Sequence, residues 1–190
     1  MNVKEIERCL QLLFASGSEA NGMPVDEAFG MWIDLTINIR ERKNTIFLIG
    51  NGASASMASH VAADLAKNGH VHTEVFSDLS LITAIANDIS YNEVFAEPLR
   101  RRMKEGDMLV IISSSGQSIN VLRAAEEAEK LGGTVVTLSA MKQENPLLNK
   151  GLINFYVPAM TYGLAETCHA AILHYWIDKT VERNSVQPDG

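Results

Sequence analysis

The sequence of 190 residues predicts an α/β protein in which helices cover a parallel β-sheet. First, short apolar segments alternate with longer segments of helical periodicity from residue 44 onward. Second, the short segments are apolar on both faces, as strands buried within a parallel sheet are. Third, glycine- and serine-rich runs directly follow two of these segments, and loops at the carboxyl ends of parallel strands commonly bind ligands.

Five strands are predicted in this part of the chain, one of them from a weaker pattern. The clear apolar segments lie at residues 45–49, 108–112, 134–138 and 153–157, and the weaker one at 71–76. Helical patterns lie between and after them, at residues 54–68, 79–88, 92–104, 118–131 and 165–182. Regular alternation of this kind is typical of a parallel sheet built from strand–helix–strand units.

Two further helices are expected before the sheet. Apolar residues recur at helical spacing at residues 3–13 and 25–42, and Pro24 stands where the first turn of a helix tolerates proline. Residues 16–24 are mostly small and polar, which predicts a loop. The large apolar side chains of these helices pack either on the core or at a subunit interface, and the sequence leaves both open. They are Leu12, Leu13, Phe29 and Trp32.

The length and composition fit one globular domain. We expect a helical lead-in at residues 1–43, an α/β core at 44–184 and a frayed polar tail at 185–190. Lys and Arg together number 16 and Asp and Glu 23, so the net charge is −7, which disfavours nucleic-acid binding. We expect no membrane span and no signal peptide, and the two cysteines form no disulfide framework. These features predict a cytoplasmic protein.

Two loops have the composition of phosphate-binding loops. Residues 50–54 (GNGAS) and 113–118 (SSSGQS) each follow a predicted strand and precede a predicted helix. Small residues allow close approach of the backbone, and free N–H groups, the helix dipole and serine hydroxyls all suit a phosphate. Neither loop has the lysine of a nucleotide-binding P-loop or a GxGxxG pattern, so the loops favour a small phosphorylated ligand over a nucleotide.

Together with AIAND at residues 84–88, the runs TIFLIGNGASA at 45–55 and IISSSGQS at 111–118 resemble a sugar isomerase (SIS) domain. Within that superfamily the sequence is similar to the phosphoheptose isomerases over residues 1–182. The resemblance implies a three-layer sandwich around a central five-stranded parallel sheet, the flavodoxin-like SIS fold. It implies conversion of D-sedoheptulose 7-phosphate to D-glycero-D-manno-heptose 7-phosphate, for lipopolysaccharide or capsule. It also implies a zinc cofactor and a homotetramer with active sites at subunit interfaces.

The resemblance assigns roles to individual residues. Asp64 falls at the position of the general base and His174 at that of the acid. The zinc-ligand positions are occupied by His60, Asp64, Glu166 and His174. The positions that contact the substrate or its phosphate are occupied by Asn51, Gly52, Ala53, Ser54, Asn87, Asp88, Ser113, Ser114, Ser115, Ser118 and Glu166.

The chain departs from the family pattern at several of these positions. Asp64 and Glu166 stand where the family usually has Glu and Gln, and Ala53, Gly163 and Asn68 stand where it has Gly, Asp and Arg. Aspartate shortens the base by one methylene, and a misplacement of about 1 Å can slow proton transfer ~100-fold. Glu166 makes the metal site more anionic. An isomerase that acts on another sugar phosphate therefore remains an alternative.

Residue spacing supports part of this site. His60 and Asp64 are four residues apart in a predicted helix, so they share a face and can bind a zinc ion or move a proton, or form a surface ion pair. Glu166 and His174 are eight residues apart, a rise of about 12 Å in a regular helix. They meet at one metal only if both side chains are extended, if Glu166 precedes the regular helix, or if the two residues come from different subunits. His169, which lies between them, is assigned no role.

A non-catalytic function is also open. Some SIS proteins that are similar to phosphoheptose isomerases keep the fold and the phosphate loop but act through their surface, as regulators that bind the replication initiator DnaA. Such a regulator has no need of the candidate ligand set. Because His60, Asp64, Glu166 and His174 occur together, the sequence favours the enzyme.

Overall fold

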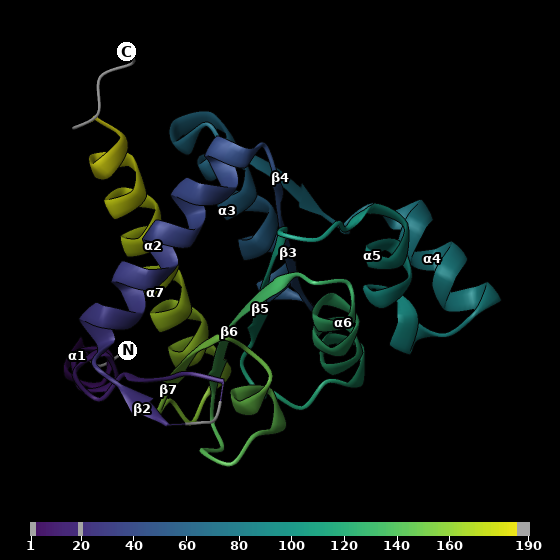
Figure 1. Ribbon diagram of the computed structural model, residues 1–190. Coiled ribbons are helices and arrows are strands. Elements are labelled where there is room, and N and C mark those ends of the chain that lie inside the picture. Colours follow the sequence, from purple (N-terminus) through teal and green to yellow (C-terminus); the bar gives the residue numbers. More distant parts are fainter. Residues whose placement is uncertain (1–2, 19–20, 186–190) are drawn as a thin grey trace.

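Figure 1 shows the computed structural model of the chain, which describes residues 3–18 and 21–185. The last helix ends at Ser185, the first residue of the tail predicted at residues 185–190. The rest of that predicted tail, residues 186–190, lies outside the described residues.

The five predicted strands form the parallel part of one sheet. They are β3 (Thr45–Gly50), β4 (His72–Val75), β5 (Met108–Ser113), β6 (Thr134–Ala140) and β7 (Ile153–Val157). In space they follow the order β4-β3-β5-β6-β7, and every neighbouring pair is parallel. Taken in chain order this is the 2-1-3-4-5 arrangement of flavodoxin-like sheets, which confirms the predicted fold class.

The sheet is wider than predicted. In the part of the chain that the structure describes it has seven strands, because β1 (Phe14–Ser16) and β2 (Gly22–Met23) extend it antiparallel beyond β7. The loop predicted at residues 16–24 is therefore wrong where these two strands form. Strands of three and two residues are too short to show an alternating pattern, and the pairing of β1 with β7 is a tertiary contact.

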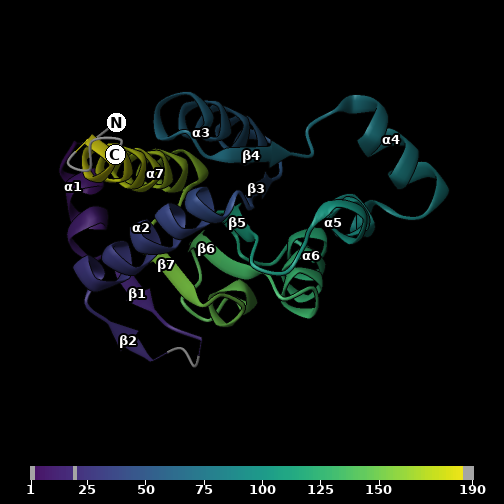
Figure 2. The same cartoon turned by 45° about the horizontal axis from the view of Figure 1, so that its top comes forward.

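Helices cover both faces of the sheet (Figures 1 and 2). One layer contains α1 (Val3–Gln11), α2 (Val25–Arg42), α3 (Ala53–Gly69) and α7 (Tyr162–Ser185). The other contains α4 (Leu79–Asp88), α5 (Ala96–Arg102) and α6 (Ile119–Lys130), with the short 3₁₀ helices η1 (Tyr91–Glu93) and η2 (Pro146–Asn149). Among the described residues, no helix combines the length and the hydropathy needed to cross a bilayer.

The central strands contribute alternate residues to two separate cores. In β3, Ile46 and Leu48 face the α2, α3 and α7 layer, whereas Phe47 and Ile49 face the α5 and α6 layer. All four are at most 1% exposed. This two-sided burial explains why the strand sequences are uniformly apolar.

The helix predicted at residues 92–104 is wrong in extent, because the structure divides it into η1 and α5. Pro98 lies in the first turn of α5, where the missing N–H leaves no helical hydrogen bond unmade. The same proline could not have continued a helix from η1, since it cannot donate to the carbonyl of Val94.

The second N-terminal helix is part of the core. Trp32 of α2 stacks on Trp176 of α7 with ring centroids 3.9 Å apart, and both are fully buried. The indole N–H of Trp176 donates to Thr36 at 2.9 Å. Phe29 is also buried, whereas Leu12 is 54% exposed. The structure thus places Phe29 and Trp32 in the core and leaves Leu12 at the surface.

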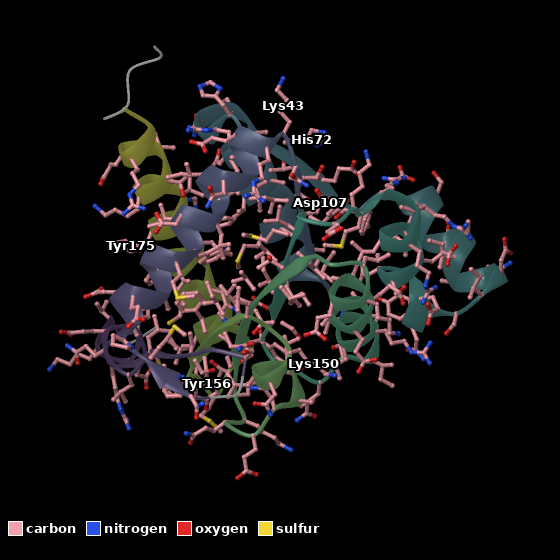
Figure 3. All side chains as sticks on the ribbon, in the orientation of Figure 1. Lys43, His72, Asp107, Lys150, Tyr156 and Tyr175 are labelled. Atoms are coloured by element: carbon pink, nitrogen blue, oxygen red, sulfur yellow. The ribbon has the colours of Figure 1, made fainter. Side chains whose placement is uncertain are left out.

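The first residues of β3 and β5 are tied together by one buried carboxylate. Asp107, labelled in Figure 3, accepts hydrogen bonds from the Asn44 side chain, the Thr45 backbone N–H and the Lys104 backbone N–H at 2.7 to 2.9 Å. These bonds fix the relative alignment of β3 and β5. The alignment matters because the two glycine- and serine-rich loops leave from the opposite ends of these strands.

Candidate functional site

Both candidate phosphate loops lie where the strand order reverses. The chain moves outward from β3 to β4 on one side and from β5 to β6 on the other, and β3 and β5 are direct neighbours. Gly50 at the end of β3 pairs with Ile112 near the end of β5. A crevice of this kind at the carboxyl ends of parallel strands is the usual ligand site of doubly wound sheets.

The first loop requires glycine at Gly50. A Cβ there would lie 2.6 Å from the Cβ of Ser54 and 2.8 Å from the carbonyl oxygen of Ile112, closer than side chains pack. Gly52 caps α3 at a φ of 58°, a backbone conformation that favours glycine. Gly52 and Ala53 are exposed, and Ser54 is buried in the first turn. The positive N-terminal end of α3 therefore faces a ligand across small side chains.

The second loop offers hydroxyls at the start of α6. Ser113 and Ser114 are buried, and Ser115 and Ser118 are partly exposed. Ser118 occupies the N-cap position of α6, but in the described part of the chain its side chain has no capping hydrogen bond. Its hydroxyl is thus available to a ligand at the positive end of the helix. Gly116 has a φ of 62°, and a Cβ there would overlap the Asn145 side chain at 2.0 Å.

The two loops are joined by a pair of asparagine side chains. The Nδ2 of Asn51 donates to the Oδ1 of Asn120 at 3.0 Å, and the Nδ2 of Asn120 donates to the Oδ1 of Asn51 at 2.9 Å. The hydroxyl of Tyr91 also donates to the Oδ1 of Asn51, at 3.1 Å. Sequence reasoning missed Asn120 and Tyr91. The one available signal was a polar residue, Asn120, two positions after Ser118 on the inward face of a helix.

Asn87 and Asp88 lie apart from the candidate metal ligands within one chain. They end α4, both are exposed, and the Asn87 amide donates to the Asp88 carboxylate at 2.8 Å. In Figures 1 and 2 α4 lies well away from α3 and α7. Their predicted contact with substrate remains a prediction.

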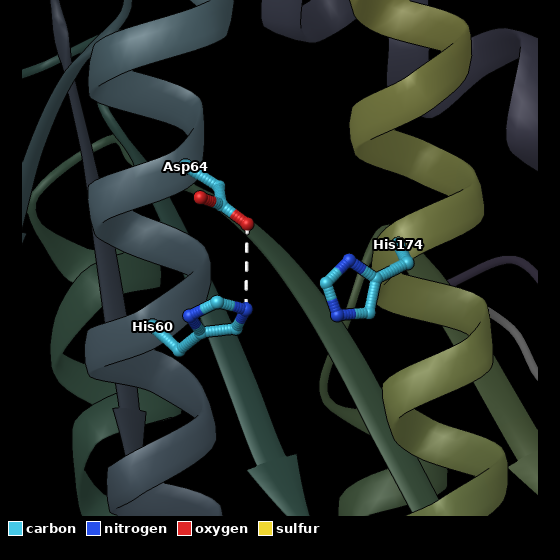
Figure 4. Close-up of side chains that lie close together, drawn as sticks. All are labelled: His60, Asp64 and His174. Atoms are coloured by element: carbon cyan, nitrogen blue, oxygen red, sulfur yellow. Dashed lines mark ion pairs between the residues drawn. The ribbon is translucent and has the colours of Figure 1, made fainter.

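Three ionisable side chains converge between α3 and α7. His60 and Asp64 point from α3 toward His174 on α7 (Figure 4). The Nε2 of His60 lies 3.3 Å from the Oδ2 of Asp64, and one ligand atom from each of the three residues lies within 4.8 Å of the other two. The rings of His60 and His174 meet edge to face, 5.4 Å between centroids.

This group has the chemistry of a metal centre. Ligand atoms of a tetrahedral zinc lie about 3.4 Å apart, a spacing that His60 and Asp64 already have. Three protein ligands of imidazole and carboxylate type leave an open position, as catalytic metal sites do. The side chains of His60 and Asp64 are 59% and 24% exposed, so a substrate can reach them. The donor set therefore fits a divalent metal ion.

Glu166 does not join the group within one chain. Among the residues that the structure describes, no fourth histidine, cysteine or carboxylate lies with these three. Glu166 is in the first turns of α7, about 12 Å before His174 along the helix axis. Of the four predicted metal ligands, one chain thus assembles three.

His169 has a structural environment although it lies between two predicted site residues. It is fully buried, and its Nε2 lies 3.2 Å from the carbonyl oxygen of Ser139. Burial lowers the pKa of this imidazole to about 4. At neutral pH His169 is therefore uncharged and has no access to solvent.

Comparisons with known proteins agree on one family. The model of the SIS domain matches residues 12–140. The phosphoheptose isomerase of Helicobacter pylori (strain Shi470) is 35% identical over 160 residues, which are 80% of this chain and 81% of that protein. The phosphoheptose isomerase of Mycobacterium tuberculosis (strain ATCC 25177 / H37Ra) is 36% identical over 137 residues, 68% of each chain.

Solved structures show the same fold. The phosphoheptose isomerase GmhA from Neisseria gonorrhoeae superimposes with a TM-score of 0.79 at 24% identity, over 94% of this chain and 92% of that one. A phosphoheptose isomerase from Francisella tularensis gives a TM-score of 0.81 at 22% identity, over 95% and 92%. At these identities the structural likeness establishes the architecture.

Proposed function

Because the chain belongs to the SIS domain family and, within it, to the phosphoheptose isomerases, we propose that it interconverts D-sedoheptulose 7-phosphate and D-glycero-D-manno-heptose 7-phosphate. One observation carries the proposal. Two loops with the composition of phosphate-binding loops meet at the switch point of the sheet, and α3 leads from one of them to a His60, Asp64 and His174 group. A phosphate anchor and a proton-transferring group on one scaffold are what an aldose–ketose isomerase of sugar phosphates requires.

The distance between anchor and reacting group suits a long sugar. From Ala53 to His60 the axis of α3 rises roughly 10 Å. An extended seven-carbon chain with its terminal phosphate is also roughly 10 Å long. The phosphate can thus bind at the start of α3 and α6 while the carbonyl end reaches the His60, Asp64 and His174 group.

The proton transfer is assigned to two of these residues. The Asp64 carboxylate removes the proton from C1 of the ketose, and His174 donates a proton to the carbonyl oxygen at C2, which gives the neutral enediol. Asp64 then returns its proton to C2 while His174 takes the hydroxyl proton at C1. The product is the aldose, and both side chains regain their starting protonation states.

The metal proposed for the group is zinc, held by His60, Asp64 and His174. Such an ion polarises carbonyl and hydroxyl oxygens as a Lewis acid. We further propose that Glu166 reaches this group from a second subunit of a homotetramer, since one chain does not bring it there. The proposed setting is cytoplasmic heptose synthesis for lipopolysaccharide or capsule.

The test is a proton NMR time course with sedoheptulose 7-phosphate in deuterated water, with zinc or with a chelator. We expect aldose signals that appear faster with zinc, and no aldose from Asp64→Ala. His72→Ala, which removes an exposed histidine at the edge of the sheet, is the matched control and should keep full turnover.

Two other outcomes would change the proposal. Exchange of substrate protons without aldose would mean that the base works on a different sugar phosphate. No exchange and no product from a folded, zinc-loaded protein would rule out this reaction and favour a phosphosugar-binding regulator.

A further inference from the structure

The orientation of the Asn120 side chain is fixed by the backbone. The Val121 N–H donates both to the carbonyl oxygen of Ser118 at 3.1 Å and to the Oδ1 of Asn120 at 3.0 Å. A backbone N–H can only donate, so the amide oxygen of Asn120 must face it and the amide NH₂ must face away. Asn120 is 2% exposed, which leaves no room for the reversed orientation to be satisfied by water.

The orientation of the Asn120 amide determines that of the Asn51 amide. The Nδ2 of Asn120 faces the Oδ1 of Asn51, and the Nδ2 of Asn51 faces the Oδ1 of Asn120. The Oδ1 of Asn51 accepts a second hydrogen bond from Tyr91, so both of its lone pairs are used. One N–H of the Asn51 amide is not needed for this pair. Asn51 therefore presents a hydrogen-bond donor, and no acceptor, between the two loops.

The position of Tyr91 next to Asn51 is fixed by the contacts of its 3₁₀ helix, η1. This helix begins with a cap in which the hydroxyl of Ser90 accepts from the Asn92 N–H at 3.1 Å. Glu93, at the other end of η1, is 7% exposed and forms ion pairs with Arg123 of α6 and Arg100 of α5. Burial alone would raise the pKa of this carboxyl, but the hydrogen bonds from the two arginines hold it below its usual value.

These contacts close a ring on α6. Asn120 and Arg123 are three residues apart, so they share one face of the helix. Asn120 reaches η1 through Asn51 and Tyr91, and Arg123 reaches it through Glu93. The ring joins the end of β3, the start of α6 and η1. All three border the switch point at which the phosphosugar is proposed to bind.

We propose that Tyr91 and Asn120 are positioning residues that hold the Asn51 amide as a hydrogen-bond donor to an oxygen of the phosphosugar. This assignment rests on the proposed function and adds to it the polarity of one substrate contact. The contact lies at the anchoring end of the site, so it stabilises bound substrate and transition state alike. Loss of the positioning then raises KM and leaves kcat unchanged.

The experiment compares Tyr91→Phe with the unsubstituted protein. Tyr91 is 55% exposed and the substitution removes only the hydroxyl, so the fold should not change. We expect KM for sedoheptulose 7-phosphate, and its Kd by calorimetry, to rise about 3- to 10-fold with kcat within about 2-fold. Tyr175→Phe is the matched control, a half-exposed phenol on α7 that Figure 3 shows on the other helical layer.

A double substitution tests whether Tyr91 acts through Asn51. Asn51→Ala combined with Tyr91→Phe should be no weaker in binding than Asn51→Ala alone, because the partner of the hydroxyl is already gone. Asn120→Asp, which replaces the donor facing Asn51 with an acceptor, should also raise KM and Kd. A purely structural role would instead lower apparent kcat, through loss of folded enzyme, at constant KM.

Unchanged constants in Tyr91→Phe, or effects that multiply in the double variant, would overturn the assignment. Binding without turnover by the unsubstituted protein would refute the isomerase and still allow the comparison of Kd values. If the unsubstituted protein neither bound nor converted the sugar phosphate, both proposals would fall.

Discussion

Two histidines on different faces of α7 have opposite environments. His169 and His174 are five residues apart, which places them about 140° apart around the helix. His169 points into the protein, is fully buried and lies against the carbonyl of Ser139. His174 is exposed and faces His60 and Asp64 across the gap to α3. Environment, and not residue type, decides which histidine can do chemistry.

The first prediction tests the role of His174, the exposed histidine of α7. His174→Ala should lower turnover of sedoheptulose 7-phosphate by about 10²- to 10⁴-fold, because it removes the proposed acid and one metal ligand. Metal content, measured by mass spectrometry after dialysis, should fall with it. The melting temperature of the metal-free protein should stay unchanged, since the side chain is exposed. Turnover within 10-fold of the unsubstituted protein would show that His174 is not the acid.

A second prediction concerns Glu166, at the start of the same helix. If another subunit supplies it, Glu166→Ala and His174→Ala remove residues of one site from different chains. Each variant alone should be nearly inactive, and mixed tetramers formed after partial denaturation should regain about a quarter of full activity, because random pairing restores that share of sites. A mixture no more active than its components would place both residues in one chain or exclude Glu166 from the site.

The third prediction concerns His169, the buried histidine, and the dependence of stability on pH. Folded His169 stays neutral down to pH about 4, whereas in the unfolded chain it takes up a proton near pH 6.5. The unfolded state therefore binds more protons between these values, and the free energy of unfolding falls as the pH drops from 6.5 to 4. The loss from this group is at most about 3 kcal/mol.

Urea unfolding at pH 7.5, 6 and 5 measures this loss. His169→Gln, which keeps a hydrogen-bonding side chain without the titration, should show a shallower pH dependence than the unsubstituted protein. His174→Gln, the same exchange at an exposed position of the same helix, is the control and should keep the original dependence. Parallel curves for His169→Gln and the unsubstituted protein would show that the buried imidazole is not held neutral.

The sequence predicts the parts of this molecule that local patterns specify. The strands at 45–49 and 108–112 and the loops after them follow from composition and order alone, and they occur in β3 and β5. The pairing of His60 with Asp64 follows from helical spacing. The position of His174 beside His60 and Asp64 depends on how α7 packs on α3. Only the family resemblance indicated that position.

The sequence could not show which distant segments of the chain contact each other. Asn51 and Asn120 are 69 positions apart, and Asn51 and Tyr91 are 40 apart, so no periodicity links them. The pairing of β1 with β7, in which Phe14 is opposite Tyr156, spans an even longer stretch of the chain and was missed for the same reason. Such contacts are set by the packing of whole elements, on which residue patterns along the chain carry little information.

The last prediction has the smallest effect and concerns Asp64, where the family usually has glutamate. Asp64→Glu moves the carboxylate outward by about 1.5 Å, away from its 3.3 Å contact with His60. We expect a decrease of kcat of about 10-fold or less, with unchanged KM and melting temperature. The reason is that the distance between α3 and α7 in this chain suits the shorter side chain of aspartate. The NMR assay measures it, with Asp64→Asn as the control that keeps the length and removes the base. If Asp64→Glu raised kcat, the shorter carboxylate would be a handicap rather than the residue to which the distance between α3 and α7 is matched.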